Sequence, residues 1–276
     1  MGNAAILLAG GSGSRMRGTV EDKVLAQLSG VPVILHSLRA FLDSASVAEV
    51  VFVCRDSVQE AAIKALIEKY FPKIGLSVKF ARGGAERQDS VLNGLRAVSD
   101  KSGLAFIHDG ARPMVGAENI ARLAGTALRD GAAVLAARAV DTIKRLPKGK
   151  KNLSKCRLAD LERGRLWATQ TPQVFRAAEI LDAYEHVKKN SIKITDDVAA
   201  AASLGIRVSI VENFSPNPKI TVPEDIALAE YLMSRGSPKS GRVQEQRRSN
   251  NKIWAQNLEL GTDTMCISWS RAAAAW

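Results

Sequence analysis

The stretch AAILLAGGSGSRMRG, residues 4–18, decides the fold class, because an apolar run stops abruptly at two glycines. A short apolar run that ends in glycine is typical of a buried strand followed by a tight turn. Five further apolar runs have the character of strands. They are AEVVFV (48–53), LSVKF (76–80), LAFIH (104–108), AAVLAA (132–137) and IRVSIV (206–211). Their alternation with helical segments predicts an α/β fold with an open, mostly parallel Rossmann-like sheet that binds ligands at the carboxyl ends of its strands.

Three segments between or after these runs carry helical signals. One opens at Pro32, one has an apolar stripe from Ile120 to Leu128, and one opens at Pro223. The chain is 46% hydrophobic but only 5% aromatic, so we expect an aliphatic core between the sheet and its helices.

The organisation changes twice along the chain. Residues 141–166, DTIKRLPKGKKNLSKCRLADLERGRL, are too basic and too weakly periodic for a layer of the core, which predicts a projecting arm. We expect residues 236–276, which hold three of the four tryptophans, to be a basic, flexible tail after a domain of residues 1–235. The tail accounts for +3 of the net charge of +11, so +8 belongs to the body of the protein.

The net charge points to an anionic ligand, either nucleic acid, acidic lipid or a phosphorylated metabolite. Cys54, Cys156 and Cys266 are odd in number and far apart, so neither a disulfide framework nor a CxxC metal site is expected. The first apolar run is too short for a signal sequence, and no run approaches the ~20 residues of a membrane span. The expected location is the cytoplasm.

The first glycine turn is followed by cations. Gly10, Gly11 and Gly13 let the backbone approach a phosphate and direct its N–H groups at it. Arg15 and Lys23 add positive charge beside the turn, a combination that suits a triphosphate. Neither a P-loop nor a dinucleotide fingerprint is present. The alternative is a tight turn with solvated cations.

A second strand also ends in glycines, in ARGGAERQDSV, residues 81–91. Gly84 permits close contact with a base or sugar, while Arg87 and Ser90 supply side-chain donors. The alternative is a helix-capping turn in which Asp89 or Ser90 lies near the helix N-terminus. The residues alone leave both interpretations open.

A third strand ends in FIHDGARP, residues 106–113, where Asp109 is followed closely by Arg112. A carboxylate at this edge, above a phosphate site, is a candidate ligand for Mg²⁺, directly or through water. His108 would point to the opposite side of the strand and is expected to be structural. Late in the chain, Lys219 is by default a surface residue, and it gains weight only if the fold returns it to the first strand.

Eight blocks follow one another across residues 3–233. They are LAGGSGSRM, Lys23, GGAERQDSV, HDGARP, DTIKR, LWATQTPQVF, ITDD and PKITVPEDIALAE. This series resembles the 2-C-methyl-D-erythritol 4-phosphate cytidylyltransferases of the non-mevalonate isoprenoid pathway. The resemblance implies a nucleotidyltransferase that moves CMP from CTP to a sugar-alcohol phosphate and releases pyrophosphate. It also implies Mg²⁺ as cofactor and a homodimer.

The resemblance assigns roles to individual residues. The catalytic cations at the α-phosphorus of CTP are Arg15, Lys23 and Lys219. The nucleotide-binding set is Ala9, Gly10, Gly11, Gly13, Gly84, Arg87 and Ser90. The substrate-side set is Asp109, Arg112, Thr142, Arg163 and Thr171, with Asp109 also on the metal side. Thr142 and Arg163 lie on the arm, which in the family crosses a homodimer and helps bind the sugar phosphate in the neighbouring subunit.

Four residues depart from the family pattern, namely Asp22, Glu162, Asp197 and Pro218. Asp22 stands where proline is usual, and its carboxylate could draw Lys23 away from the phosphates. None of the four removes a cation, so they bear on the rate rather than on the reaction.

Three alternatives stay open. A ribitol-5-phosphate cytidylyltransferase would share most of these blocks and differ in the alcohol pocket. A nucleic-acid-binding protein would suit the pI of about 9.8, but aromatic side chains for base stacking are scarce. A catalytically silent homologue would bind nucleotide without turnover. Methylerythritol phosphate is the preferred acceptor, and neither nucleic acid nor a membrane is an expected partner.

Overall fold

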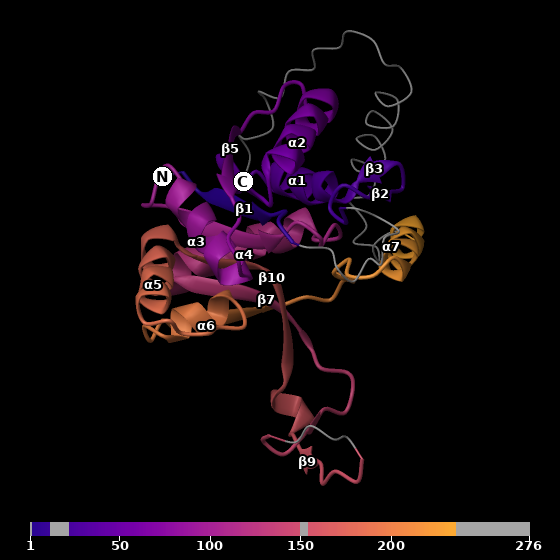
Figure 1. The fold of residues 1–276 in the computed structure, drawn as a ribbon, viewed down its shortest axis with the longest axis vertical. Helices are drawn as coiled ribbons and strands as arrows, with labels where there is room; N and C mark the ends of the chain where they lie inside the picture. The colour runs from indigo at the N-terminus through magenta and orange to yellow at the C-terminus, as the bar shows by residue number, and fades with distance from the viewer. Residues whose placement is uncertain (1, 12–21, 150–153, 236–276) are drawn as a thin grey trace. The chain divides into compact units, whose positions relative to one another are not determined.

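A seven-stranded sheet runs through the centre of the fold (Figure 1). The computed structural model describes residues 2–11, 22–149 and 154–235, and Met1–Arg235 forms one unit. The strands lie in the order β11-β7-β10-β6-β1-β4-β5. Along the chain they are β1 (Ala4–Leu8), β4 (Glu49–Cys54), β5 (Ser77–Arg82), β6 (Leu104–Asp109), β7 (Ala132–Arg138), β10 (Trp167–Arg176) and β11 (Ser209–Glu212).

The sheet is parallel except at β10, which runs antiparallel to both β6 and β7. In the parallel part, Leu8 at the end of β1 lies opposite Val53 of β4 and Asp109 of β6. The carboxyl ends of these strands therefore meet at one edge. This register brings the start of the first glycine turn, the second glycine turn and the Asp109 segment to the same edge of the sheet.

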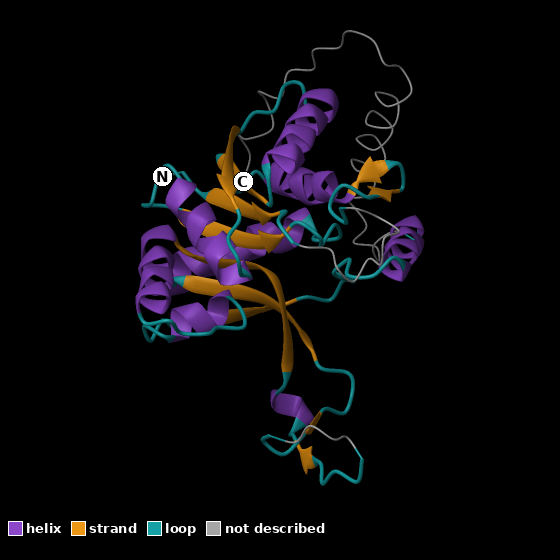
Figure 2. Ribbon diagram, viewed as in Figure 1, coloured by secondary structure: helices purple, strands orange, loops and turns teal. Residues whose placement is uncertain are grey.

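Helices cover both faces of the sheet (Figure 2). α1 and α4 pack against each other and against one face, while α3, α5 and α6 cover the other face. The helices are α1 (Val33–Ser44), α2 (Ser57–Tyr70), α3 (Arg87–Ala97), α4 (Ala117–Asp130), α5 (Ala177–Lys189), α6 (Asp197–Ala202) and α7 (Glu224–Ser234). A small hairpin of β2 (Gln27–Leu28) and β3 (Val31–Pro32) precedes α1. In the described ranges, no helix is both long and apolar enough to cross a membrane.

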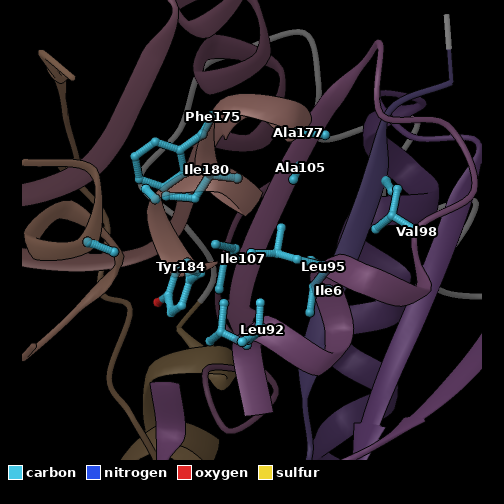
Figure 3. Close-up of a cluster of buried hydrophobic side chains, with 14 of the residues drawn as sticks. Ile6, Leu92, Leu95, Val98, Ala105, Ile107, Phe175, Ala177, Ile180 and Tyr184 are labelled. Carbon is cyan, nitrogen blue, oxygen red and sulfur yellow. The ribbon is translucent and has the colours of Figure 1, made fainter. Parts of the chain in front are cut away.

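The core is mainly aliphatic, as the composition predicts. Figure 3 shows one layer of it, in which Ile6 of β1 and Ile107 of β6 lie with Leu92 and Leu95 of α3. Alternate residues of each strand face opposite layers, since side chains along a strand alternate. His108 is accordingly on the other side from Ile107, where its ring contacts Phe41 of α1.

All six predicted strands form, within a few residues of the expected bounds, and helices begin after Pro32 and Pro223 as predicted. The sequence prediction did not identify β10 as a strand. Its middle carries the polar residues TQTPQ with little apolar alternation, and strand propensity depends strongly on tertiary context. Pairing with β6 and β7 therefore decides this strand.

The stretch 141–166 projects from the sheet, as the sequence predicts (Figure 1). The ends of β7 and β10 continue beyond the core, with Arg138 opposite Trp167 at the base of the arm. Farther out, β8 (Lys144–Arg145) pairs with β9 (Ala159–Asp160), and a short 3-10 helix, η2 (Arg163–Arg165), leads back. The described side chains of the arm are mostly exposed, so little of the arm's surface is buried within this chain.

Candidate active site

Asp109 is the centre of a cluster of charges at the carboxyl end of β6. Lys219 Nζ donates to Asp109 Oδ2 at 2.7 Å, and Arg112 Nε lies 3.6 Å from the same oxygen. Arg87 Nε lies 3.4 Å from the other oxygen, Oδ1. Residues that are more than a hundred positions apart in the sequence thus meet on one carboxylate. We call Asp109, Arg87, Arg112 and Lys219 the Asp109 cluster.

The charge state of Asp109 follows from these neighbours. Burial alone would raise the pKa of its carboxyl group, but the charges of Arg87, Lys219 and Arg112 outweigh burial and hold the pKa well below its usual range. Asp109 is therefore ionised throughout the neutral range. Three cations surround one carboxylate, which leaves the cluster attractive to an anion.

The backbone around Lys219 explains why a late lysine reaches an early strand. Ile220 N donates to Ala111 O at 2.8 Å, and Arg112 Nη1 donates to Asn217 O at 2.8 Å. These bonds tie residues 217–220 to the loop after β6. The sequence predicts a surface lysine unless the fold returns Lys219 to the first strand; the fold returns it to Asp109 of β6, the strand paired with β1.

Close packing fixes the strand end itself. A Cβ at Gly110 would lie 2.3 Å from Ile34 Cδ1 and 3.0 Å from Leu8 O, so a larger residue there would require the end of the Ile34 side chain to shift. Gly110 N also donates to Leu8 O at 3.0 Å. The turn that carries Arg112 is therefore clamped against the end of β1.

Thr171 and His108 form hydrogen bonds next to the backbone of Asp109. The Thr171 hydroxyl accepts a hydrogen bond from Asp109 N at 3.0 Å and lies 3.1 Å from His108 Nδ1. His108 is fully buried, and burial lowers its pKa to about 4, so the ring is neutral at pH 7. His108 has the structural environment that the sequence predicts. Thr171, predicted on the substrate side, uses its hydroxyl within the protein, and its substrate role stays a prediction.

Arg87 is held by a carboxylate on another helix. Its Nη1 and Nη2 donate to Asp197 Oδ1 and Oδ2 at 2.8 and 2.9 Å, a bidentate pair. Asp197 is fully buried, and Tyr184 OH donates to its Oδ1 at 2.5 Å. Burial raises the pKa of Tyr184 well above its usual value, so this hydroxyl stays protonated and donates. The guanidinium nitrogens of Arg87, which are predicted to bind nucleotide, therefore contact Asp197 and Asp109 in this structure.

The second glycine turn combines a cap with a close approach. A Cβ on Gly84 would lie 2.2 Å from the Cβ of Asp89, so the turn requires glycine. Glu86 and Asp89 form a reciprocal capping box at the start of α3, and Ser90 Oγ accepts from Gly84 N at 3.0 Å. The capping interpretation is therefore confirmed. Nucleotide binding by Gly84 and Ser90 stays a prediction, and the two are compatible.

The first glycine turn begins beside β4. Ala9 N and Gly10 N both donate to Val53 O, at 3.0 and 2.9 Å, while Gly11 faces open space. Gly13 and Arg15 lie outside the described residues. Lys23 is half-buried just after them.

Asp22, which stands where the family usually has proline, anchors the chain just before Lys23. Its carboxylate accepts from Val24 N at 3.1 Å and from Gln59 Nε2 at 2.5 Å. Gln59 Nε2 also lies within hydrogen-bond distance of Ala9 O, at 3.2 Å, so one buried amide joins both ends of the loop. Asp22 thus has a structural role of its own beside Lys23.

The arm residues are arranged differently. Thr142 is exposed, and Arg163 is exposed with its Nη1 donating to Val140 O at 3.4 Å at the base of the arm. Glu162, a departure from the family pattern, faces Arg165 at 3.6 Å. These residues are presented outward rather than gathered around Asp109.

Mg²⁺ was expected at Asp109. The described residues contain no group of three His, Cys, Asp or Glu side chains that could hold a metal ion. Cations face both oxygens of Asp109, which Mg²⁺ would need for direct ligation. The donor set does not fit direct ligation by Asp109, and it leaves contact through water.

Two residues of the site escaped functional assignment from the sequence. The sequence marks Asp197 only as a departure from the family pattern, and it carries no functional signal at Tyr184. An aspartate near a helix N-terminus is typical of a cap, and here the neighbouring Asp196 is the cap, since it accepts from Ala199 N. Tyr184 lies on a helix with an ordinary apolar stripe. Only the packing of α3, α5 and α6 reveals that both act on Arg87.

The arrangement can bind a multiply charged anion. It offers clustered cations, glycine turns with exposed backbone, and a strand edge that collects them. The described residues suggest no covalent nucleophile: His108 is buried and neutral, and burial raises the pKa of Cys54 to about 12. The chemistry that fits is charge neutralisation and positioning at a phosphate.

Comparison with known proteins gives a consistent result. The family model described as 2-C-methyl-D-erythritol 4-phosphate cytidylyltransferase matches residues 3–235. An enzyme of that name from Shouchella clausii is 39% identical over 232 residues, which is 84% of this chain and 96% of that protein. A chloroplastic relative from Oryza sativa is 38% identical over 231 residues, covering 84% of this chain and 74% of the relative.

Solved structures agree with the sequence relatives. A 4-diphosphocytidyl-2C-methyl-D-erythritol synthase from Anaerococcus prevotii superimposes with a TM-score of 0.72 at 25% identity, covering 84% of this chain and 98% of that one. A 2-C-methyl-D-erythritol 4-phosphate cytidylyltransferase from Thermus thermophilus gives a TM-score of 0.63 at 30% identity, covering 83% and 97%.

Proposed function

The chain belongs to the 2-C-methyl-D-erythritol 4-phosphate cytidylyltransferase family and is a nucleotidyltransferase; we propose that the Asp109 cluster and the two glycine turns form its active site. The reaction transfers CMP from CTP to 2-C-methyl-D-erythritol 4-phosphate in isoprenoid precursor synthesis. The observation that carries the site is the convergence of Lys219, Arg112 and Arg87 on Asp109 at the carboxyl ends of the strands.

Charge repulsion is the main barrier that the site must lower. A phosphate near −2 and a triphosphate near −4 at about 5 Å repel each other by roughly 27 kcal/mol at an effective dielectric constant of 20. Cations fixed in advance reduce this repulsion without reorganising during the reaction. The ion pair with Asp109 holds Lys219 in one place, so that its ammonium group can serve an incoming phosphate.

The chemical step needs no covalent enzyme intermediate. An oxygen of the sugar-alcohol phosphate attacks the α-phosphorus of CTP, a new P–O bond forms, and the bond to the β-phosphate breaks to release pyrophosphate. Arg15, Lys23 and Lys219 stabilise the charge on the α-phosphoryl oxygens. The backbone at Ala9, Gly10 and Gly11, with the turn of Gly84 and Ser90, binds the nucleotide.

Mg²⁺ is proposed as the accompanying cation. It would be held mainly by phosphate oxygens of CTP, with Asp109 reached through water, and when bound it would neutralise phosphate charge. Chelation should abolish turnover and added Mg²⁺ should restore it. Full activity in excess chelator would contradict this requirement.

The arm is proposed to act across a homodimer. Its exposed Thr142 and Arg163 would then bind the sugar phosphate at the site of the neighbouring subunit. Mixing Arg163→Ala and Lys219→Ala subunits tests this, because each heterodimer would regain one intact site. At sugar-phosphate concentrations well below KM, where each variant alone has little activity, the activity should rise to about a quarter of the wild-type value after random reassembly. No gain over the separate variants would indicate that the arm acts within its own chain.

The cytoplasm is the proposed location, from the widely spaced cysteines, of which Cys54 is a buried thiol. Nucleic acid is not a proposed partner. Binding to RNA that weakens steeply with salt, in the absence of pyrophosphate release, would favour that alternative.

The decisive experiment is turnover with purified acceptors. Pyrophosphate release should require CTP and methylerythritol phosphate together, with much lower kcat/KM for ribitol 5-phosphate. Activity with ribitol 5-phosphate alone would reassign the acceptor. No turnover with either acceptor would indicate a nucleotide-binding homologue without catalysis.

A further inference from the structure

A chain of polar contacts leads from the far helical layer to the Asp109 cluster. Tyr184 on α5 donates to Asp197 at the start of α6, and Asp197 binds both terminal nitrogens of Arg87 on α3. The remaining guanidinium nitrogen, Nε, faces Asp109 Oδ1. The Asp197–Arg87 contact and the Arg87–Asp109 contact each join two groups of opposite charge.

We propose that Asp197 is a positioning residue: it fixes Arg87 against one oxygen of Asp109, so that the other oxygen is presented to Lys219. The proposal rests on the proposed function for its kinetic effect. Arg87 then acts through Asp109 rather than as a direct contact of the nucleotide.

The two oxygens of the Asp109 carboxylate have different partners. Arg87 lies at Oδ1, while Lys219 and Arg112 lie at Oδ2. A guanidinium that is bound at both terminal nitrogens cannot rotate freely, because the fork of Arg87 matches the carboxylate of Asp197. Without this anchor, Arg87 could swing away, and Asp109 could turn its freed oxygen toward Lys219 or Arg112.

Because Asp197 is buried, its charge requires a partner. Asp197 has no exposed surface, and its oxygens bind Arg87 and Tyr184. A buried charge that loses its partner is strongly unfavourable, so Arg87 and Asp197 hold each other in place. The cluster thereby gains a fixed geometry that a solvated arginine would not supply.

Asp197→Asn tests the proposal, because it keeps the size of the side chain and removes the charge. We expect kcat to fall about 30-fold while KM for CTP changes little, since small misplacements of a catalytic group reduce the chemical step. Asp197→Glu restores the charge and should retain clearly more activity than Asp197→Asn. Arg87→Gln should resemble Asp197→Asn, and the double variant should be little worse than either single variant.

The chain offers a matched control pair. Arg96 on α3 and Glu185 on α5 form a bidentate pair of similar geometry, at 2.8 and 2.9 Å, between two of the same helices, but it is exposed and lies nine residues along α3 from Arg87. Arg96→Gln and Glu185→Gln should leave kcat and KM unchanged. An equal loss in these variants would show that any ion pair in this layer acts only through stability.

Tyr184→Phe covers the case in which Asp197→Asn does not fold. It keeps both charges, removes one hydrogen bond, and should lower kcat about threefold at unchanged KM for CTP. A crystal structure of Asp197→Asn, or of Arg87→Gln where Asp197→Asn does not fold, provides a readout without turnover: the Arg87–Asp109 contact should be lost, and Lys219 should shift from Oδ2.

Three results would overturn the proposal. One is unchanged kcat in both Asp197→Asn and Tyr184→Phe. Another is a raised KM for CTP at constant kcat in Arg87→Gln, which would make Arg87 a nucleotide contact. The third is an unmoved Asp109–Lys219 pair in the variant structure. Absence of wild-type turnover would instead refute the proposed function, while the variant structure would still decide the positioning.

Discussion

The Asp109 cluster and the arm contribute to one proposed site, yet they are built in opposite ways. Asp109 of the cluster is buried, its three cations are half-buried and paired, and the members come from β6 and the loop after it, α3 and the segment before α7. The arm is exposed, and Arg163 donates its hydrogen bond to Val140 O at the base of the arm rather than to the cluster. A cluster fixed by its own chain can perform its role in one subunit, whereas an exposed arm requires another surface to act upon.

The largest expected effect breaks the cluster at its catalytic member. Lys219→Ala should lower kcat by about 10³-fold, which is about 4 kcal/mol of barrier, because a charge that stabilises the transition state is lost. Folding should be little affected, since Arg87 and Arg112 still face Asp109. Steady-state kinetics measures the effect, and exposed Lys73→Ala is the control. Unchanged turnover would remove Lys219 from the catalytic set.

The second effect compares carboxylates in the two regions. Asp109→Ala removes the buried carboxylate that three half-buried cations face, leaves Lys219 and Arg112 without this partner, and should lower the free energy of unfolding by about 3 kcal/mol. Asp160→Ala in the arm removes an 85% exposed side chain that pairs with Lys144, and should lower it by less than about 0.5 kcal/mol. Urea unfolding measures both. Similar losses would show that the cluster is no more tightly built than the arm.

The third effect concerns pH. Burial lowers the pKa of His108 from its usual 6.5 to about 4, so at pH 5 the unfolded chain binds a proton there and the folded protein does not. Stability should therefore fall by about 2 kcal/mol through this residue between pH 7 and pH 5. His108→Gln should lack this part of the pH dependence in urea unfolding. The same slope in both proteins would contradict a neutral buried His108.

The fourth effect belongs to the arm. Arg163→Ala should raise KM for the sugar phosphate about tenfold, or about 1.4 kcal/mol, without changing KM for CTP or the melting temperature. The exposed side chain stabilises little of the fold, so only its contact with substrate is lost. A raised KM for CTP instead would place the arm at the nucleotide.

The smallest effect is expected outside both regions. Ending the chain after Arg235 should leave kcat/KM within about twofold of the full-length value, because the family match ends there. Steady-state assays of the purified shortened protein provide the comparison. Loss of activity or of soluble protein would assign residues 236–276 a part in the fold.

The sequence anticipated the cluster only in part. Asp109 and Arg112 were visible because polar residues directly follow an apolar run. The residues alone do not predict that Lys219 meets them, since 110 residues separate Lys219 from Asp109; only the family resemblance places Lys219 in the same site. Arg87 shows the reverse: its type suggested an anion ligand, while the structure pairs it with Asp197, which sequence reasoning had noted only as a departure.

The amino-acid sequence alone determined the alternation of strands and helices, the glycine turns, the projecting arm and the family. These depend on local periodicity and on residues that are close together along the chain. The tertiary structure decided that β10 joins the sheet, that Lys219 and Asp197 reach the Asp109 cluster, and that a buried glutamine closes the first loop. Such contacts depend on register and packing between distant segments, because a charge is stabilised by whatever the fold places beside it.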